Sequence, residues 1–220
     1  MKHTPRFAVV LSGYGVFDGS EIHEATLTLY AIAKNGGTYE IFAPDMAQYH
    51  VVDHLTGAPT GEKRNVLSEA ARIARGKIVP LQKFDAGRFD ALIFPGGFGV
   101  AKNLFPFAVE GPDSRVQPDA ERAIREMHRA GKPIGALCIA PVLLAKVLGN
   151  IEVTIGNDSD TISLLHQLGA SHKTTGHGEI VVDRANRIVT SPCYMLDANI
   201  VQIAEGAERT VQAMMEMIEK

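Results

Sequence analysis

Short apolar segments alternate along this chain with longer segments whose apolar residues recur at helical spacing, and this alternation constrains the fold most strongly. Residues 7–11, 91–95 and 134–137 are almost entirely apolar, which is typical of strands that are buried on both faces of a sheet. Segments with helical periodicity separate them. The sequence therefore predicts an α/β fold in which helices cover a mostly parallel sheet.

The same patterns give approximate limits for the individual elements. Ser20 is expected to cap the first helix, and Gly206 is expected to bend or break the last one. Residues 100–118 contain three prolines and are expected to form an irregular excursion near the sheet edge. Strands are predicted at residues 7–11, 39–43, 78–81, 91–95, 134–137 and 153–155, a hairpin at 179–183 and 187–190, and helices at 21–35, 66–75, 119–130, 141–148, 161–168 and 197–220.

Length and composition exclude several classes of protein. The 220 residues contain no linker or internal repeat, so residues 1–220 are predicted to form a single domain. The 22 basic and 25 acidic residues give a net charge of −3, which provides no electrostatic basis for binding nucleic acid or an anionic membrane. No apolar segment is long enough to span a bilayer. Two cysteines are too few for a disulfide scaffold, and no export signal is visible, so a cytoplasmic location is expected.

Cys138 stands where a predicted strand turns sharply into a predicted helix. The strand covers residues 134–137, and the helical segment begins near Pro141. A side chain at such a turn lies at the carboxyl edge of the sheet, where helix amides favour the thiolate, the nucleophilic form of cysteine. Two interpretations stay open from these residues alone. Cys138 is either a nucleophile or a small apolar residue of the core, which is how many free cysteines behave.

A glycine-rich turn, GGFG, follows the predicted strand at residues 91–95. Gly96 and Gly97 would let backbone amides approach an anion closely, as an oxyanion hole requires. The amide of Ile139, the residue after the cysteine, is the second expected donor. The alternative is a turn whose glycines serve only its backbone dihedral angles.

Two glutamates, Glu21 and Glu24, share one face at the start of the first predicted helix. A carboxylate in the first turn often only complements the helix dipole, and this explains Glu21 best. Glu24 stands where the apolar face of the helix begins, so burial and a nearby thiolate would raise its pKa. We therefore expect Glu24 rather than Glu21 to exchange protons with Cys138.

Several segments together resemble a known superfamily. LSGYGVFDGSEIHEA, FPGGFG and ALCIAP occur in an order and at spacings that resemble the class I glutamine amidotransferase-like superfamily, in its PfpI branch. HLTG at residues 54–57, RNVLSEAARIARG at 64–76, TIGND at 154–158 and the region 194–196 resemble more narrowly the ElbB-type glyoxalase-like proteins, which are associated with isoprenoid biosynthesis. The resemblance spans essentially the whole chain.

This resemblance implies a fold, a site and a reaction. The implied fold is a flavodoxin-like three-layer sandwich with a nucleophile-elbow cysteine, usually assembled as a homodimer. By position, the resemblance implies Cys138 as the reactive cysteine, Glu24 as the glutamate that reaches it and Gly97 as the oxyanion glycine. ElbB-type proteins convert glyoxal to glycolate without glutathione or metal. The implied substrate is therefore a small dicarbonyl compound, and no cofactor or metal is expected.

The chain departs from the wider superfamily because no histidine accompanies the cysteine. Protease-like and amidotransferase members place one beside the cysteine or on a later strand, where Ile139 and TIGND stand here. A glutaminase or peptidase is therefore disfavoured, since amide hydrolysis needs a positioned acid. His54 and His177 lie in predicted loops and are kept as lesser candidates for a base. The main alternative to a glyoxalase is a non-catalytic protein whose thiol senses oxidants or binds a partner.

Overall fold

The computed structural model describes residues 3–219, and it confirms the predicted α/β fold. Seven strands form the central sheet in the order β3-β2-β1-β4-β5-β9-β8, and only the β8–β9 pair is antiparallel. The predicted hairpin is this pair. The strands are β1 (Arg6–Val10), β2 (Thr38–Ala43), β3 (Val79–Pro80), β4 (Ala91–Phe94), β5 (Ile134–Leu137), β8 (Val181–Asp183) and β9 (Ile188–Ser191).

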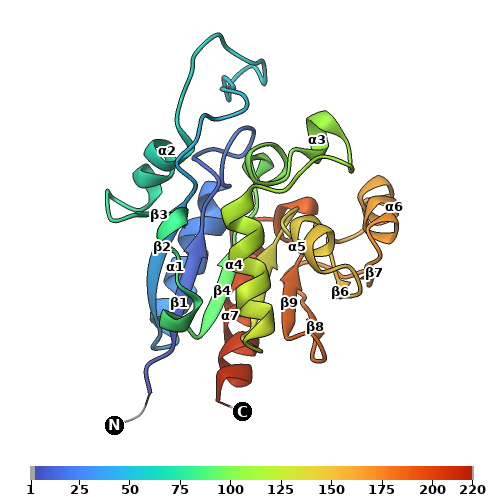
Figure 1. Cartoon of the computed structure of the whole chain (residues 1–220). Helices are drawn as coiled ribbons and strands as arrows, with labels where there is room; N and C mark the ends of the chain where they lie inside the picture. The colour runs from blue at the N-terminus through green and yellow to red at the C-terminus, as the bar shows by residue number, and fades with distance from the viewer. Residues whose placement is uncertain (1–2, 220) are drawn as a thin grey trace.

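Helices cover both faces of the sheet and give three layers (Figure 1). One layer holds α1 (Ile22–Lys34), α2 (Val66–Ile73) and α7 (Ile200–Ile218), and the other holds α4 (Pro118–Arg129) and α5 (Pro141–Leu148). A small parallel sheet of β6 (Glu152–Val153) and β7 (Ser171–His172) lies beside α6 (Ser159–Gln167). The short β7 was not predicted. Within residues 3–219, every helix is too short or too polar to cross a bilayer.

The apolar runs in the sequence are explained by burial on two sides. Phe7 and Val9 of β1 belong to the apolar cluster that includes α1 and α7 residues. Ala8 and Val10 belong to the cluster that includes α4 and α5 residues. Because successive strand side chains point to opposite faces, a strand between two helical layers must be apolar at every position.

The cap of α1 differs from the prediction. The N-cap residue is Glu21, whose side chain accepts a hydrogen bond from the Glu24 amide at 2.7 Å. The Ser20 hydroxyl instead accepts one from the Ser12 amide at 2.8 Å and so fastens the loop that follows β1. The prediction of Ser20 is wrong because tertiary structure gives its hydroxyl a different partner.

Residues 100–118 are more regular than predicted. They contain a π-helical segment, Val100–Leu104, and the short helix α3 (Phe107–Glu110). Leu104 and Phe105 are buried in the core, so this segment is packed rather than an open excursion. The Asn103 side-chain amide donates to the carbonyl oxygens of Ser12 and Asp18 at 2.9 and 3.0 Å. The segment therefore supports the loop after β1.

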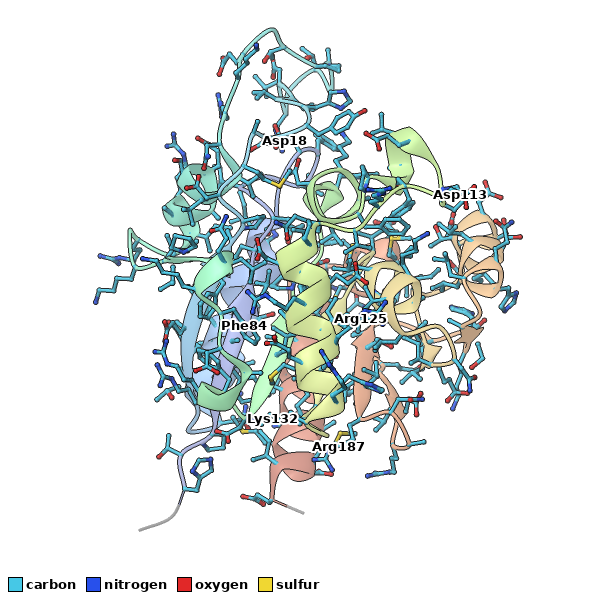
Figure 2. The ribbon with its side chains drawn as sticks, in the orientation of Figure 1. Asp18, Phe84, Asp113, Arg125, Lys132 and Arg187 are labelled. Atoms are coloured by element: carbon cyan, nitrogen blue, oxygen red, sulfur yellow. The ribbon has the colours of Figure 1, made fainter. Side chains whose placement is uncertain are left out.

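A long connection between β2 and α2 rises above the carboxyl ends of the strands (Figure 1). Asp18 lies at its base (Figure 2) and is buried, and its Oδ2 accepts a hydrogen bond from the Val52 amide at 2.7 Å. This contact fixes the connection to the loop after β1.

Helix α7 runs without a break from Ile200 to Ile218, so the prediction of a break at Gly206 is wrong. The glycine instead permits close packing against β9. A Cβ built on Gly206 would lie 2.6 Å from the Ser191 Oγ, which is shorter than atomic contact allows. Ser191 is buried and its hydroxyl donates to the Glu179 carbonyl at 2.9 Å, so this side chain cannot move away without losing a bond.

Gly206→Ala is expected to destabilise the protein, although alanine normally favours a helix. The added methyl group collides with Ser191, and overpacking of this kind costs about 1–3 kcal/mol of unfolding free energy. Chemical denaturation measures this loss, and adding Ser191→Ala should recover part of it by removing the colliding atom. A more stable Gly206→Ala variant would show that helix propensity decides the outcome.

Candidate active site

Cys138 follows directly after β5 and lies in a strained turn. Its backbone φ is 59°, a left-handed conformation that residues other than glycine adopt at a cost of about 1–2 kcal/mol. The Cys138 amide donates to the Ser191 carbonyl at 2.9 Å, which holds the turn against the end of β9. Helix α5 then begins at Pro141. The side chain is 6% exposed, so only a narrow opening reaches it.

Glu24 extends from α1 to the same point and is completely buried. Its Oε2 accepts a hydrogen bond from the Gly96 amide at 2.9 Å, and its Oε1 accepts one from the Tyr194 amide at 3.2 Å. A Cβ built on Gly96 would lie 2.6 Å from the Glu24 Oε2 and 3.0 Å from the Cys138 Sγ, so the carboxyl and the thiol are neighbours. The two residues expected to carry the chemistry are thus in contact, although they are distant in the sequence.

Burial controls the protonation of this pair. Burial, with a smaller contribution from the nearby Glu21, raises the pKa of Glu24 from 4.5 to about 8, although the amides of Tyr194 and Gly96 act to lower it. Burial also raises the pKa of the Cys138 thiol well above its usual value, and Glu24 adds to this. The helix-amide argument is therefore wrong for the resting site, because loss of water outweighs the amides around the sulfur.

The glycines and Ile139 meet at the cysteine as expected, but their roles differ. The amides of Gly97 and Ile139 both lie near the Cys138 sulfur and act to lower the pKa of its thiol. The Gly96 amide is already bound to Glu24. A Cβ built on Gly96 would lie 2.3 Å from the Cys138 Cβ and 2.6 Å from the Glu24 Oε2, so no larger residue fits. Gly96 therefore permits the contact between thiol and carboxyl, while Gly97 and Ile139 can bind an oxyanion.

Two neighbours of the site are placed there by the order of the strands rather than by a local sequence motif. Cys193 is buried just beyond the end of β9, close enough to Cys138 to contribute to the raised pKa of its thiol. Leu137 of β5 pairs with Ser191 of β9, which brings both cysteines to one edge of the sheet. Tyr194 binds Glu24 through its amide. The sequence shows that a second cysteine exists. Its place beside Cys138 depends on the order of the strands, which the sequence does not state.

The histidines stay outside this cluster. His23 forms a hydrogen bond with the Tyr194 hydroxyl at 2.8 Å rather than with Glu24 or Cys138. The His54 Nδ1 lies 3.0 Å from the Val52 carbonyl and its Nε2 accepts from the Phe17 amide at 3.3 Å. His177 is exposed in the loop before β8. Across residues 3–219, no group of three or more His, Cys, Asp or Glu side chains is arranged to hold a metal ion.

Glu24→Gln is expected to flatten the pH dependence of stability. A folded-state pKa of about 8 means that Glu24 stabilises the fold in its protonated form. That contribution is complete below pH 4.5 and is lost as the pH rises through 8, at about 1.4 kcal/mol per pH unit. Chemical denaturation of both proteins between pH 5 and 8 measures the difference. Parallel curves would contradict a raised pKa.

Comparison with known proteins gives a consistent assignment at the level of family. No family model matches the chain. It is 48% identical over 225 residues to the human glutamine amidotransferase-like class 1 domain-containing protein 3, mitochondrial, covering 98% of this chain and 84% of that protein. It is 38% identical over 232 residues to the ES1 protein, mitochondrial, of Danio rerio, covering 97% and 86%.

Solved structures confirm the flavodoxin-like α/β fold. The Ehrlichia chaffeensis isoprenoid biosynthesis protein with an amidotransferase-like domain superposes with a TM-score of 0.90 at 34% identity, covering 96% of this chain and 99% of that one. Candida albicans glyoxalase III gives a TM-score of 0.62 at 14% identity, covering 98% of each chain, and this likeness shows the fold alone.

The relatives contradict the expected location. The human, rat and Danio rerio proteins are all named as mitochondrial, so the expectation of a cytoplasmic protein is wrong. Two free cysteines indicate a reducing compartment, and this criterion does not separate the cytoplasm from other reducing compartments. With 48% identity across 98% of its length to the human protein, the chain belongs to the family of glutamine amidotransferase-like class 1 domain proteins that includes the ES1 proteins.

Proposed function

We propose that this protein is a glyoxalase of the ElbB type, which converts small dicarbonyl compounds to 2-hydroxy acids without glutathione. Cys138 is the nucleophile, and Glu24 carries protons. The observation that carries the proposal is the burial of the Glu24 carboxyl and the Cys138 thiol side by side against Gly96. Glyoxalase III from Candida albicans shares the fold, which makes the reaction class compatible with this architecture.

The reaction begins with proton transfer, because the raised pKa of Cys138 keeps its thiol protonated at neutral pH. The Glu24 carboxylate takes this proton as the sulfur attacks one aldehyde carbon of glyoxal. The carbonyl oxygen becomes an oxyanion beside the amides of Gly97 and Ile139, which stabilise it. It then takes the proton from Glu24, and the product is a hemithioacetal.

An internal redox step follows and needs no external oxidant. Glu24 removes the proton from the carbon bonded to sulfur and delivers it to the second carbon, while the hydroxyl proton passes to the second oxygen. The first carbon is oxidised to a thioester and the second is reduced to an alcohol. Water then cleaves the carbon–sulfur bond, releasing glycolate and a proton and restoring the thiol.

The competing functions make different demands on the site. Amide hydrolysis needs an acid positioned for a poor leaving group. The histidines His23 and His54 are bonded elsewhere. A peroxide sensor needs an accessible thiolate, whereas Cys138 is buried with a raised pKa. The predicted homodimer stays a prediction.

Cys138→Ala is expected to abolish glyoxal turnover while leaving the melting temperature nearly unchanged. Loss of a covalent nucleophile should lower kcat/KM at least about 10³-fold, from a wild-type value near roughly 10⁴ M⁻¹s⁻¹ for a dedicated substrate. Glycolate formation measures this directly, and Cys193→Ala serves as the matched cysteine variant. If turnover survives in Cys138→Ala and disappears in Cys193→Ala, the nucleophile is Cys193 and the proposal is wrong.

The rate is expected to rise with pH through the pKa of Glu24. Only the carboxylate accepts the thiol proton, so kcat/KM for glyoxal should increase about tenfold per pH unit below the pKa. The increase should level off above a pH of about 8. Initial rates between pH 6 and 9, corrected for the uncatalysed reaction, provide the profile. A wild-type kcat/KM that does not change with pH would show that Glu24 does not accept the thiol proton.

A further inference from the structure

A separate groove of about 950 Å³ lies at the β2 edge of the sheet, between α1 and the turn that follows α2. It exists because β3 is very short. β3 pairs only with Phe42 and Ala43, so the first part of β2 has no strand outside it. None of the residues that line this groove belongs to the Cys138 site. We call it the β2 groove.

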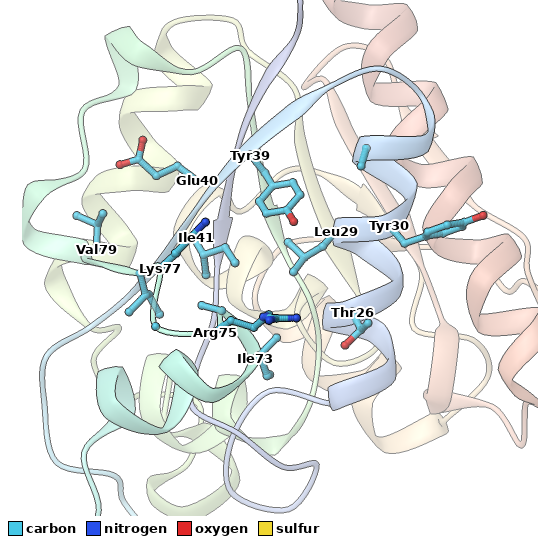
Figure 3. Close-up of a pocket in the computed structure, with 14 residues that line it drawn as sticks. Thr26, Leu29, Tyr30, Tyr39, Glu40, Ile41, Ile73, Arg75, Lys77 and Val79 are labelled. Atoms are coloured by element: carbon cyan, nitrogen blue, oxygen red, sulfur yellow. The ribbon is translucent and has the colours of Figure 1, made fainter.

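The β2 groove has an apolar lining with aromatic character. Leu29 of α1, Ile41 of β2 and Ile73 of α2 contribute apolar surface, and Tyr39 is 42% exposed within it. Figure 3 shows the Tyr39 ring above the middle of the groove. A cavity of this size and composition can hold a small organic molecule.

Two cations line the same groove without a partner. Figure 3 shows the Arg75 side chain reaching across it toward Leu29 and Thr26, with Lys77 beside Ile41. Within residues 3–219, neither side chain makes a hydrogen bond or an ion pair. The one acidic residue of the lining, Glu40, is already bound by Arg6 and by Arg88. The positive charge of the groove is therefore not neutralised from within.

Arg75 occupies a position that suits glycine better. Its φ is 53°, in the left-handed region, in the turn that ends α2, and Gly76 beside it has a φ of 78°. Placing an arginine there stores strain that a glycine would avoid. Stability of the turn alone would favour glycine, so the arginine is explained better by what its side chain does in the groove.

We propose that the β2 groove binds a small anionic molecule with a flat apolar body, such as an aryl phosphate. Arg75 and Lys77 bind the anion, and Tyr39 with Leu29 and Ile73 packs against the ring. A second copy of the chain suits this surface less well. A symmetric pair would bring the uncompensated cations of both copies into one patch, and charged residues are depleted from interface centres.

Calorimetric titration with 1-naphthyl phosphate tests the site, with inorganic phosphate and 1-naphthol as the separate halves of the probe. We expect one saturable site for the complete probe, with each half binding at least about tenfold more weakly. Arg75→Gly and Lys77→Gln should each weaken binding about tenfold or more, whereas the exposed control Lys173→Gln should not change it.

Arg75→Gly also separates binding from folding. Because glycine accepts the left-handed turn, this variant should keep or raise the melting temperature while losing affinity. Equal binding by all variants, or binding of 1-naphthol as tight as that of the phosphate, would overturn the proposal. Absence of binding together with a dimer that Tyr39→Asp dissociates would assign the groove to a second copy and also overturn it.

Discussion

The buried carboxyl of Glu24 is the interaction on which the rest of the site depends. Its two oxygens accept hydrogen bonds from the Gly96 and Tyr194 amides, so one side chain joins α1 to the ends of β4 and β9. Without these donors, a carboxylate buried there would lose its hydrogen bonds to water and form no others to replace them. Burial outweighs these donors, so the site stabilises the neutral acid and keeps a proton next to the Cys138 sulfur.

Close packing at this edge of the sheet has a conformational cost in the backbone. Cys138 and Cys193 both have positive φ, and both end neighbouring strands. Gly96 lies so near Cys138 that a methyl group on Gly96 would overlap its side chain. Gly206 lets α7 approach Ser191 at the end of β9. These four positions are one arrangement, because the turn after β5 can lie against the end of β9 only if its neighbours leave space. Strain at such sites persists where surrounding contacts determine it.

The sequence predicted features that follow from local patterns. Alternating apolar runs identified the layers, and the residues beside each turn identified Cys138, Glu24, Gly97 and Ile139, which the structure brings together. Prediction from the sequence failed where the partner of a residue comes from a distant part of the fold. Ser20 has the chemistry of a cap, yet its hydroxyl bonds Ser12, and Gly206 suggests a break that packing removes. Cys193 could not be assigned to the site from the sequence, because only the pairing of β5 with β9 places it beside Cys138.

The same burial that raises both pKa values also limits what can react. Cys138 is 6% exposed and Ile139 is 9% exposed, so a bulky group cannot reach the sulfur without displacing the turn. This burial favours the proposed two-carbon dicarbonyl over a peptide as the substrate, since a peptide would have to open the site. In the proposed reaction the Glu24 carboxylate takes the thiol proton, and the neutral acid that forms is the state that burial favours. The reaction therefore uses the burial that also makes the resting thiol unreactive, because the proton moves between sulfur, carboxyl and oxyanion where water is excluded.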